Sequence, residues 1–130
     1  MNSGLLSNLA RILVVEDDHV LRASIEDVLT SQGHTVVSFA DAEAIEDLSI
    51  LENIDIILLD LTLPGQDGIH FAQHVRAKNE QIGIIIHSAR SKSSEIGLGF
   101  IAGADAYITK PASMNEICNA VQSLNSRLTV

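Results

Sequence analysis

Polar side chains follow four apolar runs of this 130-residue chain, each at the point where the run stops. The clearest run covers residues 56–59, four aliphatic residues that are followed by Asp60. A run that is apolar at every position is typical of a strand buried on both faces of a parallel sheet, and open α/β sheets bind ligands at the carboxyl edge of their strands. The residues that this pattern gathers at one edge are Glu16, Asp17, Asp18, Asp60, Ser88 and Lys110.

Several acidic groups at one edge repel one another unless a cation lies among them. Mg²⁺ prefers oxygen ligands, usually one or two carboxylates together with waters and a phosphate. The sequence therefore predicts a Mg²⁺ site formed by Asp60 with Asp17 or Asp18, to which the backbone carbonyl of Thr62 could add a ligand. Taken alone, Asp17 and Asp18 could equally cap a helix, and Asp60 could begin a turn.

The chemistry that fits these groups is attack by the Asp60 carboxylate on phosphorus, which gives an acyl phosphate. Phosphoryl transfer depends mainly on positioning and on neutralisation of charge. The cation and Lys110 would supply the neutralisation, and Ser88 would orient the transferred group. Because a carboxylate is already ionised at pH 7, no general base is required.

Strands and helices are expected to alternate along the chain and so to position these side chains. The apolar runs predict strands at 11–15, 35–39, 55–59, 83–87 and 106–108, and the helical periodicity predicts helices at 20–32, from 41, at 68–79, at 91–102 and from 113. Gly33 fits a helix stop, Asp41 an N-cap, and Ser113 with Glu116 a capping box. We therefore expect a doubly wound, flavodoxin-like α/β fold with a five-stranded parallel sheet in the order 2-1-3-4-5 and five helices.

Composition limits the functional classes. The formal net charge of −9 and the pI near 4.7 disfavour direct binding to nucleic acid or to an anionic membrane. No apolar run reaches the length of a membrane helix, and the first residues do not resemble a signal peptide. The single cysteine, Cys118, excludes an internal disulfide and favours a cytoplasmic location. We expect a short tail at 1–9 and one domain at 10–127.

Four motifs together resemble the receiver domain of two-component response regulators. They are the acids at 16–18, LLDLTLPGQDG around Asp60, Ser-Ala-Arg at 88–90 and Thr-Lys-Pro at 109–111, and the run 97–111 is similar to the family almost throughout. The resemblance implies that Asp60 is the phosphoacceptor of a histidine kinase or a histidine phosphotransfer protein. It also implies that Asp17 and Asp18 hold Mg²⁺, with Asp18 the more direct ligand.

The same resemblance implies a conformational switch and the residues that operate it. Ser88 matches the switch hydroxyl, Tyr107 the switch aromatic and Lys110 the lysine of the family, and the peptide bond between Lys110 and Pro111 is expected to be cis. Phosphorylation would then remodel the face built from the fourth helix, the fifth strand and the fifth helix, through which the domain could also dimerise. Thr62 and Arg90 flank the crevice and could tune the lifetime of the phosphate.

Two positions depart from the family pattern. His87 stands where an apolar residue is usual, and Ala112 follows Pro111 where Phe is frequent. Neither belongs to the phosphorylation set. His70 and His74 have the i, i+4 spacing of a metal pair, but no third ligand accompanies them, and a solvated helix face is expected.

Other functional classes fit less well. An aspartate-nucleophile phosphatase would carry a second acid where Thr62 stands, and a flavin carrier would need a phosphate-binding loop where this chain has acids. We therefore expect no turnover of small molecules beyond the domain's own phosphorylation and dephosphorylation. The alternative is a pseudo-receiver, an interaction module that is never phosphorylated. Output would pass through a domain beyond Val130 or a separate effector, and the kinase, stimulus and effector are not encoded.

Overall fold

The computed structural model describes residues 9–45, 48–62 and 68–128. Its centre is a single sheet in which all paired strands are parallel, in the order β2-β1-β3-β4-β5, as predicted. Most of β1, and all of β3 and β4, is buried, because helices cover both faces of the sheet. The strands are β1 (Arg11–Val15), β2 (Thr35–Phe39), β3 (Ile56–Leu59), β4 (Gly83–Ser88) and β5 (Ala106–Thr109).

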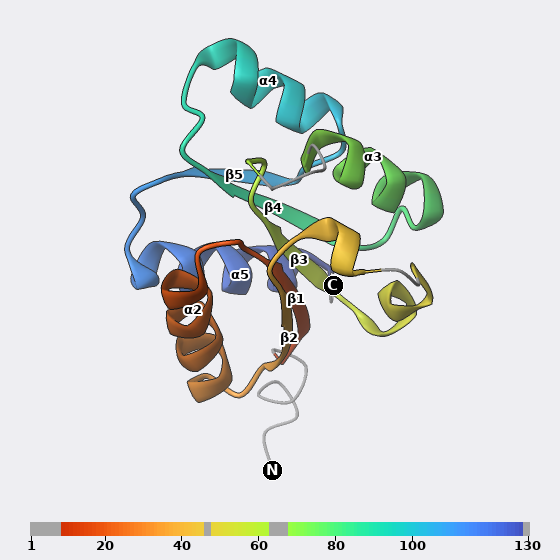
Figure 1. Cartoon of the computed structure of the whole chain (residues 1–130). Helices are drawn as coiled ribbons and strands as arrows, with labels where there is room; N and C mark the ends of the chain where they lie inside the picture. Colours follow the sequence, from red (N-terminus) through yellow and green to blue (C-terminus); the bar gives the residue numbers. More distant parts are fainter. Residues whose placement is uncertain (1–8, 46–47, 63–67, 129–130) are drawn as a thin grey trace.

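In the part of the chain that the structure describes, four α-helices form the outer layers. They are α2 (His19–Ser31), α3 (Gly68–Lys78), α4 (Ser93–Ile101) and α5 (Met114–Leu128). Figure 1 shows α2 and α5 on one face of the sheet and α3 and α4 on the other. Alternate residues of each strand enter two separate cores, so that Val14, Leu58 and Ile85 pack towards α2 and α5, whereas Val15, Leu59 and Ile86 pack towards α3 and α4.

The connection between β2 and β3 differs from the prediction. In place of an α-helix from Asp41 the chain forms two 3₁₀ helices, η1 (Ala42–Ala44) and η2 (Leu48–Asn53), and residues 46–47 lie outside the described part. Asp41 does act as the predicted N-cap, since its Oδ1 accepts a hydrogen bond from the Ala44 N–H at 2.8 Å. The segment carries acids at 43, 46, 47 and 52 and no lysine or arginine, and like charges at i, i+3 and i, i+4 disfavour a longer α-helix.

The other predicted helix signals are confirmed. Gly33 follows α2 with φ of 96°, a left-handed conformation that favours glycine. Before α5, Ser113 Oγ accepts from the Glu116 N–H at 3.1 Å, and Glu116 Oε1 accepts from the Ser113 N–H at 3.3 Å, which completes the capping box. Within the described ranges, no helix is both long and apolar enough to cross a bilayer.

Candidate functional site

Asp60 lies directly after β3, at the carboxyl edge of the sheet. Its N–H donates to the Val15 carbonyl at 3.0 Å, so the residue is fixed by the sheet rather than by a loose turn. Its side chain is 5% exposed, and its Oδ1 accepts a hydrogen bond from the Thr62 N–H at 2.9 Å. A Cβ on Gly68 would come within 2.6 Å of Leu61 Cα, which shows how closely α3 begins against this segment. The loop at 63–67 lies outside the described residues.

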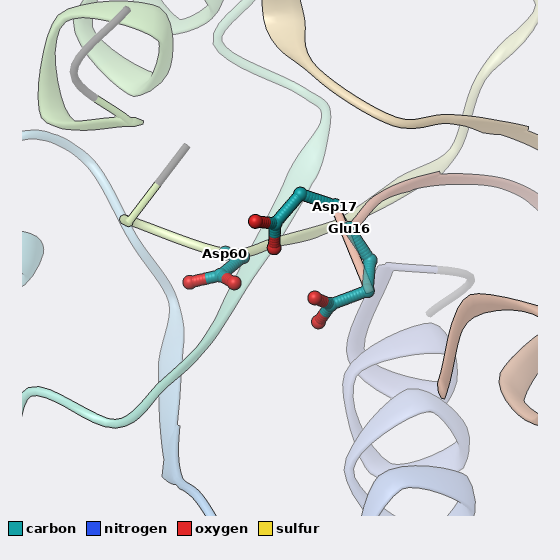
Figure 2. A group of neighbouring side chains, drawn as sticks. All are labelled: Glu16, Asp17 and Asp60. Carbon is teal, nitrogen blue, oxygen red and sulfur yellow. The ribbon is translucent and has the colours of Figure 1, made fainter. Parts of the chain in front are cut away.

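Three carboxylates meet at this edge. Glu16 and Asp17 follow β1 and Asp60 follows β3, and one oxygen of each lies within 4.8 Å of the others. Figure 2 shows their carboxylates turned towards a common space. Glu16 and Asp60 are buried and Asp17 is exposed, so the group opens to solvent on the side of Asp17. Oxygen ligands of this kind suit a hard divalent cation such as Mg²⁺.

The structure places the Asp18 side chain elsewhere than the sequence predicted. It was expected beside Asp60 as the more direct ligand, but its Oδ1 accepts hydrogen bonds from the Val20 N–H at 3.0 Å and the Leu21 N–H at 3.1 Å. These are N–H groups of the first turn of α2, which have no partner within the helix, and a short aspartate at the N-cap satisfies them. The acid that instead accompanies Asp17 is Glu16, because β1 ends one residue before it.

Lys110 supplies the positive charge at the centre of the site. Its Nζ lies 2.8 Å from Glu16 Oε1 and 3.0 Å from Asp60 Oδ2, so one ammonium group joins the two buried carboxylates. Lys110 follows β5, and its N–H donates to the Ser88 carbonyl at 2.8 Å. The peptide bond between Lys110 and Pro111 is cis, as expected.

Burial and ion pairing shift the pKa values of this pair. Burial raises the pKa of Glu16 above its usual range, although the hydrogen bond from Lys110 acts in the opposite direction. Burial alone would lower the pKa of Lys110, but its hydrogen bonds to Glu16 and Asp60 outweigh that effect and raise it. Lys110 is therefore charged at neutral pH, and its charge offsets that of the two buried carboxylates.

Ser88 and Tyr107 meet beside this group. Ser88 ends β4 fully buried, and its Oγ accepts a hydrogen bond from the Arg90 N–H at 3.2 Å. The Tyr107 hydroxyl donates to the Arg90 carbonyl at 2.6 Å. Burial raises the pKa of Tyr107. The predicted switch pair is thus linked through the loop after β4.

Thr62 and Arg90, which were expected to flank the crevice, contact each other. Arg90 Nε donates to Thr62 Oγ1 at 3.3 Å, which brings both to the mouth of the site. The role of the Thr62 carbonyl as a ligand stays a prediction. His70 and His74 are exposed on α3, as expected, and Cys118 is buried on α5.

Sequence reasoning missed two features of this site. The importance of Glu16 could have been found from the strand period of two, which places Glu16 on the same face as Val14. His87 departs from the family pattern, and the structure places its imidazole in the interior, next to Ser88 in the chain.

Comparisons with known proteins agree with this geometry. The sequence model of the response regulator receiver domain matches residues 12–122. The transcriptional regulatory protein RprY of Bacteroides fragilis is 36% identical over 118 residues, which cover 91% of this chain and 50% of that protein. The chain spans about half the length of the curated relatives it matches.

Two solved structures have closely similar folds. A CheY-like receiver domain protein of Methanospirillum hungatei has a TM-score of 0.84 at 26% identity, over 92% of this chain and 96% of that one. The BeF3-activated DrrB receiver domain has a TM-score of 0.83 at 25% identity, over 92% and 99% of the two chains, and DrrB is a Thermotoga maritima protein.

Proposed function

Because the chain belongs to the response regulator receiver domain family, we propose that Asp60 accepts a phosphoryl group from a histidine kinase or a histidine phosphotransfer protein. The observation that carries the proposal is the position of the Asp60 carboxylate. It is buried, lies 3.0 Å from the Lys110 ammonium, and lies within 4.8 Å of two further acids. A structural aspartate in a turn would need neither the cation nor the other acids.

The reaction is a phosphoryl transfer between two side chains. An Asp60 oxygen attacks phosphorus, the bond from phosphorus to the donor imidazole nitrogen breaks, and the imidazole leaves with its electron pair. Lys110 lowers the repulsion between the incoming phosphoryl group and the buried acids. Asp60 Oδ1 is held by the Thr62 N–H, which fixes the carboxylate plane before the donor arrives.

Glu16, Asp17 and Asp60 would hold the Mg²⁺ ion, with the Thr62 carbonyl as a further ligand. When bound, the ion neutralises charge on the transferred group and on the acids. Asp18 caps α2 instead, because its Oδ1 accepts hydrogen bonds from two N–H groups of that helix. This revises the metal ligands expected from the sequence.

Ser88 and Tyr107 would pass the phosphorylation signal from Asp60 to the surface of the domain. A phosphoryl group on Asp60 would accept a hydrogen bond from the Ser88 O–H and draw Ser88 away from the Arg90 N–H, from which its Oγ now accepts. Displacement of this loop would release the Tyr107 hydroxyl from the Arg90 carbonyl and remodel the face of α4, β5 and α5. We propose that this face controls an output domain or a separate effector and can mediate dimerisation. It exposes Leu98, Phe100 and Ile101 on α4.

The test is an intact-mass measurement after incubation with acetyl phosphate and Mg²⁺. The wild type should gain one phosphoryl group, Asp60→Asn should gain none, and Asp41→Asn, a matched change at the cap of η1, should behave as the wild type. No adduct on the wild type, with acetyl phosphate and with a histidine kinase as donor, would refute the proposal in favour of the pseudo-receiver.

A second measurement distinguishes the two sets of metal ligands. Mg²⁺ at millimolar concentration should raise the melting temperature of the wild type, because it binds the folded state. Asp17→Asn should lose most of this response. Asp18→Asn should keep it, since asparagine also caps helices well. Loss of the response in both variants would restore Asp17 and Asp18 together as the ligands expected from the sequence.

A further inference from the structure

An apolar pocket of about 390 Å³ lies between the start of α2 and the loops that follow β4 and β5. Its volume falls within the range of about 300–1,000 Å³ that is usual for small-molecule sites. The residues that line it are Leu21, His87, Ala89, Lys110, Pro111 and Ala112. Four of the six are apolar, and the Lys110 ammonium group is already engaged by Glu16 and Asp60. The pocket therefore suits an uncharged ligand, because a charge would be desolvated there without a partner.

Both positions that depart from the family pattern line this pocket. Ala112 stands where Phe is frequent, and His87 stands where an apolar residue is usual. A benzyl side chain at position 112 would occupy space that the Ala112 methyl group leaves open. The pocket thus has room for one aromatic ring, and it arises from residues of this chain rather than from the common pattern of the family.

His87 gives the inner end of the pocket one polar group. It is 2% exposed, whereas the other five lining residues are half-buried or exposed, so the imidazole lies deepest. Among the described residues, its Nε2 is the one buried side-chain nitrogen or oxygen without a hydrogen bond. Buried polar atoms nearly always have a partner, because leaving one unpaired costs the free energy of its desolvation. A ligand that brings a polar atom to the inner end would therefore gain a hydrogen bond.

The state of the imidazole decides which ligand group fits. Burial, and then the charge of Lys110, lower the pKa of His87 to about 4, so the ring is neutral at pH 7. In a neutral imidazole Nε2 is a donor in one tautomer and an acceptor in the other. A hydroxyl group both donates and accepts, so it can pair with Nε2 in either case. A carboxylate only accepts and an ammonium group only donates, and each would bring a charge into an apolar pocket.

We propose that this pocket is a binding site for a small, neutral aromatic molecule that carries a hydroxyl group, with its ring against Pro111 and Ala112 and its hydroxyl group hydrogen-bonded to His87 Nε2. The site differs from that of the phosphoryl group, although Lys110 contributes to both. No covalent step is involved. The inference rests on the pocket and not on phosphorylation of Asp60, so either can fail without the other.

The test is a titration of the ¹⁵N-labelled wild type at pH 7 with 4-methylphenol and with toluene, which lacks the hydroxyl group, followed by ¹H–¹⁵N NMR. Both probes should shift the amide signals of Leu21, Ala89 and Ala112, and 4-methylphenol should also shift the His87 Nε2 signal. The phenol should bind at least about fivefold more tightly than toluene, the gain expected for one neutral hydrogen bond. No shift of these amides with either probe, or equal affinity for the two, would overturn the proposal.

Variants of His87 test the hydrogen bond. His87→Leu should abolish the difference between the two probes while toluene still binds. His87→Gln, whose amide group both donates and accepts, should restore most of the difference. His74→Leu, on the exposed face of α3, is the control and should bind both probes as the wild type. A difference that persists in His87→Leu would show that another group holds the hydroxyl, against the proposal.

Variants of Ala112 test the position of the ring. Ala112→Phe fills the open space and should weaken both probes at least about tenfold, while Ala77→Phe, the same enlargement on the exposed face of α3, should not. Ala112→Leu should act in the same direction as Ala112→Phe, and urea unfolding of both shows that the loss is not one of folding. Wild-type affinity in the two Ala112 variants would place the ring elsewhere and overturn the assignment.

A tyrosine side chain of another protein carries the same ring. N-Acetyltyrosinamide presents that ring on a peptide backbone, and it should bind no more tightly than 4-methylphenol, because the mainly apolar lining offers little to a backbone. Clearly tighter binding of N-acetyltyrosinamide would assign the pocket to a partner protein instead of a free small molecule.

Discussion

Replacing Lys110 by methionine removes the cation between two buried carboxylates. Breaking a buried ion pair from one side costs about 3–5 kcal/mol, because the remaining charge stays desolvated. The Lys110 side chain keeps 20% of its exposure, against 2% for Glu16 and 5% for Asp60, so water can reach part of the space. We therefore expect the lower end of the range, a loss of about 3 kcal/mol in the free energy of unfolding at pH 7.

The pH dependence of this loss identifies its cause. Burial already raises the pKa of Glu16 with Lys110 present, and without the cation the pKa should rise further. An acid whose pKa is higher in the folded than in the unfolded state contributes most stability below its unfolded pKa and loses that contribution as pH rises through its folded pKa. The cost of Lys110→Met should therefore shrink when the pH falls from 8 to 5.

The assay is urea unfolding of the wild type and Lys110→Met at several pH values, with and without Mg²⁺. Millimolar Mg²⁺ should recover part of the loss, because a dication among the acids replaces the missing charge. Lys78→Met, on the exposed end of α3, is the control and should change stability by less than about 0.5 kcal/mol. An equal loss at pH 5 and pH 8, or a loss no larger than that of the control, would refute the electrostatic explanation.

Two further predictions concern α4 and the interior. Gly99→Ala should destabilise by about 1–3 kcal/mol, since its Cβ would lie 2.8 Å from Ile86 Cδ1 and 3.1 Å from Tyr107 Cε2. The Cβ added by Gly97→Ala would meet no heavy atom within 4 Å, so this change should raise the free energy of unfolding by about 0.5–1 kcal/mol. Equal effects of the two substitutions in urea unfolding would contradict this packing. The low pKa of His87, which faces Lys110, Asp60 and Glu116, implies stability that is complete above about pH 6.5 and is lost as pH falls towards 4. Wild type should lose about 3 kcal/mol more than His87→Leu over that range, and parallel pH profiles of the two proteins would show that His87 is not the titrating group.

Much of the site could be predicted from local sequence. The apolar run before Asp60, the acids after the first strand, Ser88 after the fourth and Lys110 after the fifth all follow from strand patterning and the geometry of parallel sheets. The capping box of α5 and the glycine after α2 are equally local, because they depend on backbone groups a few residues away.

Other features depended on details that local patterns do not contain. The acids at 16, 17 and 18 are adjacent and chemically alike, so their roles depend on where β1 stops and α2 starts. That boundary assigns Glu16 to the buried carboxylates and Asp18 to the helix cap. The segment after β2 has helical periodicity, yet its unbalanced acidic charge left only 3₁₀ helices in the described part.

The sequence by itself determined the layered parallel fold and the chemistry available at its carboxyl edge. Both arise from short-range patterns, namely the apolar runs and the residue that ends each of them. The tertiary structure alone decided which side chains face one another. Lys110 meets Glu16 across 94 residues, and His87 joins the row of Glu16 and Asp60 through the pairing of β1, β3 and β4. Register and burial are properties of the assembled sheet, and they place the His87 imidazole in the interior, on the strand next to Asp60.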